Sequence, residues 1–366
     1  MRGVNLNLVN NEAIIFDWLK FFLLGQVVLG HIVALGMPSM AQIDGLGGFA
    51  YWVIMAKAAA GFGRESAFQF IFLSGFFSAP SLLGIHDAPS LLAALRKRGR
   101  RLYPALVISL VFTAALDSLG GLFTGDVYAV NGLHYNAALH QGMRLFWANV
   151  LGLQPTWART YGSNGALWTL GYLIQYYFLT ALALHGGGSR FVAAILTALI
   201  LLALALLPAE FGALYLLWLL GLGMRRRFAS PLLKVYPGLA VLLAALLFGL
   251  SKWGGYVYSL ALSPLLGLVL LAAVKAFARQ FVRIFALMSA RRGENRLYNP
   301  RRWADWMFLI YVTHLPVLFF AAAAAAELRW PAPGFFVGFA VVAAFGIVAA
   351  ASISHKLLAL AGPESG

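Results

Sequence analysis

Long apolar runs, separated by short polar segments, dominate the 366-residue chain. Runs of about 20 apolar residues are typical of membrane-spanning helices, whereas the strands of a membrane barrel show short alternating segments. The runs are continuous in Leu, Ala, Val and Phe and predict ten spans: 13–36, 66–84, 102–120, 165–184, 191–207, 210–223, 232–250, 256–274, 303–326 and 334–358. We therefore expect an all-α integral membrane protein, with about ten transmembrane helices forming a single domain over residues 1–366.

Two longer segments interrupt the spans. Residues 121–164 predict an outer loop whose aromatic side chains suit either an interfacial belt or a platform for sugar rings. Residues 275–302 predict a basic inner segment, in which Lys275, Arg279 and Arg283 recur every four residues. That spacing gives a basic stripe on one helix face, which is typical of a helix lying at a membrane surface.

Composition excludes a water-soluble globule, because 61% of the residues are hydrophobic and only 11% are charged. The net charge of +15 would suit a nucleic-acid partner, but its placement indicates topology instead. With both termini in the cytoplasm, 20 of the 27 Lys and Arg residues fall on the cytoplasmic side and 6 on the outer side. This bias follows the positive-inside rule, so we expect membrane lipids and no nucleic acid as partners. The chain has no cysteine.

The first predicted span carries three ionisable side chains, and such groups are costly inside a membrane. At 100° per residue, Lys20 lies about 60° and His31 about 40° from Asp17, so all three share one helix face. The rise puts His31 about 21 Å beyond Asp17, which rules out a hydrogen bond between them. The pattern favours a polar, wet face toward a bundle interior, although His31 can also be a satisfied interhelical hydrogen bond.

Five motifs in order resemble those of the acyltransferase 3 family of membrane acyltransferases. They are FDWLKFFLLGQVVLGHIVALG (16–36), FQFIFLSGFF (68–77), RGRRLYP (98–104), NGALWTLGYLIQYYFL (164–179) and DWMFLIYVTHLPVL (305–318). Lys20 stands where that family has arginine, which keeps the charge but loses the planar fork. Leu173 stands where it often has glutamate, so any role of that carboxylate is in doubt. Ser74 and Gly75, in the second motif, predict close helix packing first and a pore lining second.

The resemblance implies enzymes that take acyl groups, often acetyl, from cytoplasmic acyl-CoA and esterify sugars across a bacterial inner membrane. An alcohol needs a base to attack a thioester, and histidine has a suitable pKa. His31 lies toward the outer side, where a sugar would arrive, and is the expected catalytic base. His314, near mid-membrane, is the rival base, with a merely structural role as its alternative; we place it with the acceptor site.

The resemblance also implies a donor site on the inner side. Asp17 and Lys20 are expected to line the donor channel. Arg98 and Arg101, three residues apart, would face the same way on a helix and bind the phosphates of acyl-CoA. Their alternative is a plain topology signal, because the inner loops of such proteins are rich in basic residues.

For the acceptor, the expected lining is a polar and aromatic stripe on the fourth span: Asn164, Trp168, Tyr172 and Gln175. Hydrogen bonding between helices is the alternative for this stripe. Arg64, at the outer start of the second span, would orient the substrate or stabilise an oxyanion.

The sequence thus predicts an O-acyltransferase that uses acyl-CoA, with acetyl as the expected group, and no metal. A transporter or flippase for an anionic or glycolipid substrate is the alternative from another class, and a non-catalytic scaffold is a third. The acceptor's identity and the oligomeric state are left open.

Overall fold

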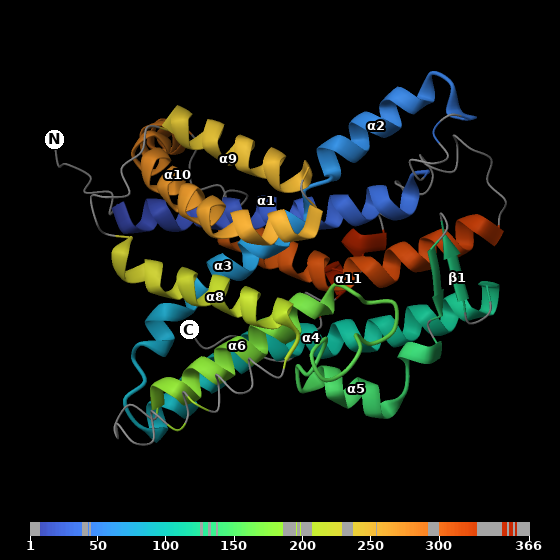
Figure 1. The fold of residues 1–366 in the computed structure, drawn as a ribbon, viewed down its shortest axis with the longest axis horizontal. Helices are drawn as coiled ribbons and strands as arrows, with labels where there is room; N and C mark the ends of the chain where they lie inside the picture. The colour runs from blue at the N-terminus through green and yellow to red at the C-terminus, as the bar shows by residue number, and fades with distance from the viewer. Residues whose placement is uncertain are drawn as a thin grey trace.

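The structure is a computed structural model that describes residues 8–38, 45–124, 127–130, 133–136, 138–185, 207–228, 237–253, 255–291 and 300–327, with further positions at 43, 195, 198, 346–349, 351–353 and 356. The described chain is a helix bundle (Figure 1). Its longer helices are α1 (Leu8–Gly36), α3 (Gly63–Leu82), α4 (Ala88–Thr124), α6 (Leu167–His185), α8 (Ala209–Arg227), α9 (Pro237–Trp253), α10 (Gly255–Arg291) and α11 (Pro300–Glu327). Two shorter helices are α2 (Phe49–Ala60) and α5 (Met143–Val150).

Within the described residues, five helices are long and apolar enough to cross a membrane. They are Ile14–Gly36, Ala88–Leu122, Leu167–His185, Gly255–Ala278 and Asp305–Ala324. This confirms an all-α membrane architecture, while the count of ten spans and the cytoplasmic termini stay predictions. The predicted spans 191–207 and 334–358 lie largely outside the described residues.

Helix α3 is the most enclosed element of the bundle. It packs against α1, α8 and α10, and most of its side chains are buried. A Cβ atom at Gly75 would overlap the carbonyl oxygen of Trp218, and one at Gly221 would overlap that of Phe72. Each glycine therefore receives the backbone of the other helix, which confirms the close packing predicted at Ser74 and Gly75.

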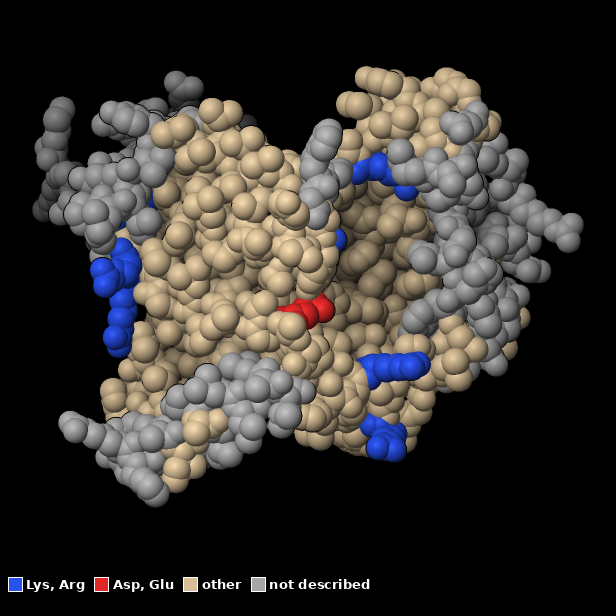
Figure 2. All heavy atoms as spheres, viewed as in Figure 1, with Lys and Arg blue, Asp and Glu red and all other residues tan. Residues whose placement is uncertain are grey.

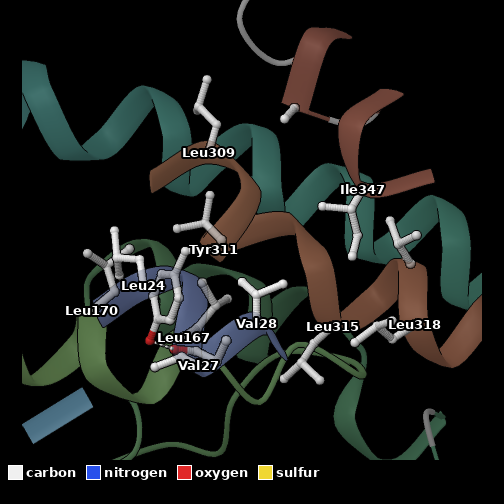
Figure 3. Close-up of a cluster of buried hydrophobic side chains, with 14 of the residues drawn as sticks. Leu24, Val27, Val28, Leu167, Leu170, Leu309, Tyr311, Leu315, Leu318 and Ile347 are labelled. Atoms are coloured by element: carbon white, nitrogen blue, oxygen red, sulfur yellow. Dashed lines mark hydrogen bonds between the residues drawn. The ribbon is translucent and has the colours of Figure 1, made fainter. Parts of the chain in front are cut away.

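A second contact surface joins α1 to α11 and α11 to α4. Leu24 and Val28 of α1, Leu167 and Leu170 of α6, and Leu309, Leu315 and Leu318 of α11 form one apolar cluster (Figure 3). This packing holds α1 and α11 side by side, and each helix carries a histidine at the contact.

The predicted outer loop 121–164 has structure of its own. It contains a hairpin of β1 (Val127–Val130) and β2 (Leu133–Asn136), followed by α5. Phe146 of α5 packs edge-on against Tyr161, while Trp147 and Trp157 are exposed. The loop thus combines a packed aromatic contact with free aromatic surface.

The predicted inner segment 275–302 begins as a direct continuation of α10, which runs to Arg291. Lys275 donates to the carbonyl oxygen of Phe228 at 2.6 Å, tying α10 to the inner end of α8. Residues 292–299 lie outside the described residues, so a separate surface helix stays a prediction.

Candidate functional site

The N-terminal half of α1 carries an ion pair. Lys20 Nζ donates to Asp17 Oδ1 at 2.9 Å, and the same ammonium lies 4.0 Å from the centre of the Phe77 ring. Both charged side chains keep about a fifth of their surface exposed. The shared helix face predicted for Asp17 and Lys20 is therefore observed, and both side chains remain partly exposed.

The sequence predicted that Arg98 and Arg101 face the same way on α4. The structure shows that they do not. Arg98 donates to Ser74 Oγ at 3.0 Å, and its guanidinium lies 5.2 Å from the Tyr177 ring. Arg101 turns instead to Asp305 of α11, at 3.7 Å, with both side chains mostly exposed. The three-residue spacing leaves a 60° offset, which is enough to direct the two cations to different neighbouring helices.

A small cavity lies beside Arg98, between α4 and α6. It has a volume of about 230 Å³ and is lined by Leu95, Arg98, Gly99, Leu102, Tyr103, Ile174, Tyr177 and Phe178. One charged group in an otherwise apolar and aromatic lining suits the phosphate-bearing end of an amphipathic ligand.

The histidines that the sequence treated as rivals are in direct contact. His31 Nδ1 lies 2.8 Å from His314 Nε2, and the ring planes are inclined by 25° with their centres 5.0 Å apart. His314 is fully buried, whereas His31 remains partly exposed. His314 Nδ1 lies 2.6 Å from the carbonyl oxygen of Tyr311.

These contacts assign the protons of the neutral pair. A carbonyl oxygen can only accept, so His314 Nδ1 carries a hydrogen and donates it to Tyr311. Nε2 of His314 is then the acceptor, and His31 Nδ1–H is its donor. This leaves His31 Nε2 with a free lone pair, on the ring that is partly exposed. His314 thus orients the ring of His31 through this hydrogen bond.

Asn164 does not lie on a helix, because α6 begins only at Leu167. Its side chain is fully buried and donates to the carbonyl oxygen of Val312 and to Ser109 Oγ, both at 2.8 Å. The prediction that Asn164 shares a helix face with Trp168, in the polar and aromatic stripe of the fourth span, is therefore wrong. Asn164 lies in the loop before α6 and joins this loop to α4 and α11.

Gln175, the last member of that stripe, holds the outer loop. It donates to the carbonyl oxygens of Gly152 and Gln154, at 2.8 and 3.2 Å. Its neighbour Gly171 has no room for a Cβ against Gln154. Leu173 is buried in an apolar cluster, where a glutamate would find no water.

Trp168 and Tyr172 do form an aromatic edge. Their rings meet edge-on at 5.7 Å, and Tyr172 packs the same way on Phe211 at 5.4 Å. Trp168 is partly exposed and Tyr172 is buried. Arg64 lies near the start of α3, 39% exposed, 3.4 Å from Glu65 and over the Tyr256 ring at 5.9 Å.

Sequence reasoning missed the acidic and phenolic partners of Arg64. Glu65 is buried and accepts a hydrogen bond from Ser259 at 2.7 Å, and the ring of Tyr256 lies 5.9 Å from the Arg64 guanidinium. Glu65 stands beside Arg64 in the sequence, at the start of an apolar predicted span. A carboxylate at that place is a sequence signal for such a partner. Figure 2 shows the surface hollowed beside α10 and below α2, with acidic and basic side chains at the edges of the hollow.

The fold and these contacts define a multi-pass membrane protein with a histidine pair between α1 and α11. The chain belongs to the acyltransferase 3 family, whose acyltransferase domain model matches residues 14–354. No curated protein and no solved structure matches the chain. In the part of the chain that the structure describes, no three His, Cys, Asp or Glu side chains gather as a metal site.

Proposed function

We propose that this protein is an O-acyltransferase of a bacterial inner membrane, moving an acyl group, acetyl as the expected one, from cytoplasmic acyl-CoA to a hydroxyl of an extracytoplasmic carbohydrate or glycoconjugate. Ten spans with both termini in the cytoplasm would place the Asp17 end of α1 inside and His31 toward the outer face. The observation that supports this most is the histidine pair, because its hydrogen bonds leave Nε2 of His31 unprotonated on a side chain that is partly exposed.

In this mechanism His31 Nε2 takes the proton of the acceptor hydroxyl as its oxygen attacks the thioester carbonyl carbon. The new C–O bond gives a tetrahedral oxyanion. Its collapse breaks the C–S bond, and the leaving thiolate takes the proton back from His31, which regenerates the neutral base. Throughout, the bond to His314 keeps the His31 ring in one orientation.

The donor would enter from the inner mouth. Lys20, Arg98 and Arg101 supply cations there, and the Arg98 cavity has room for a narrow part of the ligand. Asp17 keeps Lys20 in place. On the outer side, the partly exposed Trp168 would offer an aromatic face for a sugar, with the buried Tyr172 packed against it, and Arg64 remains exposed enough to contact the sugar.

The test uses protein reconstituted in vesicles with one orientation, acyl-CoA on one side and an oligosaccharide acceptor on the other. We expect consumption of acyl-CoA only from the cytoplasmic face, with the acylated sugar on the opposite face and free CoA where it was added. A flippase would move an unmodified substrate and leave the thioester intact. If acyl-CoA is consumed from neither face, the proposed acyltransferase activity is refuted.

A further inference from the structure

The carbonyl oxygen of Val312 lacks the N–H donor that an α-helix normally supplies four residues further on. Pro316 lies four residues further along α11, and proline has no N–H to donate to it. Two side chains from elsewhere take over: Ser109 Oγ donates to this oxygen, and Asn164 Nδ2 donates to it at 2.8 Å. Ser109, Asn164 and Val312 are all fully buried, so water cannot replace either donor.

The turn of α11 around His314 is held at further points by the same loop. The hydroxyl of Tyr311 donates to the carbonyl oxygen of Ala166 at 3.1 Å. Gly165 lies against the side chain of Leu315, since a Cβ there would be 3.6 Å from its Cδ1. The residues on both sides of His314 are thus fixed by the segment just before α6.

That segment is in turn anchored on α4. The carboxylate of Asp117 accepts hydrogen bonds from the backbone N–H of Ser163 at 2.7 Å and from its hydroxyl at 2.5 Å. Gly162, the residue before Ser163, has a φ of +54°, and a Cβ atom there would overlap the carboxylate of Asp117. These contacts hold the loop that carries Asn164 in one position on α4. Asn164 in turn hydrogen bonds to α11, so the loop also holds α11 in place.

We propose that Asn164 and Ser109 are positioning residues for the histidine pair. A proline leaves a helix free to bend at the missing hydrogen bond. The two donors hold the backbone of α11 at this point, and with it the place of His314 Nε2 opposite His31 Nδ1. The effect on turnover rests on the proposed acyltransferase function, but the geometry does not.

Asn164→Ala and Ser109→Ala should each lower kcat about tenfold, with the KM values for donor and acceptor unchanged. Ser109→Thr keeps a hydroxyl and should restore most of the rate. In a His314→Leu background Asn164→Ala should cost nothing more, because no ring is left to position. Thr180→Val is the matched control: it removes a buried hydrogen bond of 2.9 Å to Tyr215, between α6 and α8, and should leave kcat unchanged.

A second measurement needs no activity, because the chain contains no cysteine of its own. His31→Cys and His314→Cys together should be joined rapidly by a short bifunctional thiol reagent. Adding Asn164→Ala or Ser109→Ala should slow this cross-linking several-fold, and adding Thr180→Val should not. Unchanged cross-linking with either variant, in protein that elutes as wild type, would overturn the proposal, even if the wild type consumed no thioester. Additive losses of kcat in the His314→Leu background would also overturn it.

Discussion

Replacing His314 with leucine removes the atom that accepts the hydrogen bond from His31 Nδ1. The catalytic ring stays, but nothing then favours the tautomer with a free Nε2. A hydrogen bond of this kind contributes about 0.5–1.5 kcal/mol net, and 1.4 kcal/mol is a factor of ten. We therefore expect His314→Leu to lower kcat about tenfold. His31→Ala, which removes the base itself, should cost about 10²–10⁴-fold.

The assay follows release of CoA with a thiol reagent, and the enzyme adds no background because it has no cysteine. His314→Gln is the matched variant, since its amide oxygen reaches about as far as Nε2 and can still accept. It should recover part of the lost rate. If His314→Leu is as inactive as His31→Ala, His314 itself transfers the proton and the assigned roles are wrong. If it turns over like the wild type, the contact between the rings has no function.

Arg98→Ala should raise KM for acyl-CoA about tenfold or more, because a charge-assisted bond to phosphate contributes about 1.5–3 kcal/mol, and it should leave KM for an acyl-pantetheine thioester unchanged. Equal losses with both donors would mean that Arg98 serves only the fold. Gly221→Ala should destabilise the protein by about 1–3 kcal/mol, since its Cβ would overlap the carbonyl oxygen of Phe72. Gly223→Ala, where a Cβ meets nothing within 4 Å, should leave thermal stability in detergent unchanged, and similar melting of both variants would contradict the packing argument.

Hydropathy predicted the helices well but not their ends. Apolar composition predicted a span over 102–120, whereas α4 begins fourteen residues earlier at Ala88. The intervening turns carry the cluster of basic residues at 96–101, which a hydropathy window excludes although they continue the helix. Hydropathy reports where a helix enters lipid, and a helix need not end there. The same reason explains the extension of α10 to Arg291.

The site was predicted in its parts and not in its connections. Lys20 and Asp17 are three residues apart, so local geometry was enough to place them together. His31 and His314 are separated by 283 positions, and no helical spacing can reveal such a contact. Asn164 was assigned to a helix because its spacing to Trp168 fits one. In the structure Asn164 donates to the carbonyl oxygen of Val312, which Pro316 leaves without its usual helical donor. Nothing in the sequence links Asn164 to that helix.

The backbones of α3 and α8 touch at two glycines, where Gly75 meets Trp218 and Gly221 meets Phe72, and this contact has a mechanical consequence. Two backbones in direct contact leave no side chains to rearrange, so α3 and α8 cannot part or slide without losing the whole contact. They behave as one stiff wall. A ligand that enters the bundle would therefore have to pass elsewhere than between these two helices. The space bordered by Arg98 and Tyr177 lies between α4 and α6, away from that contact.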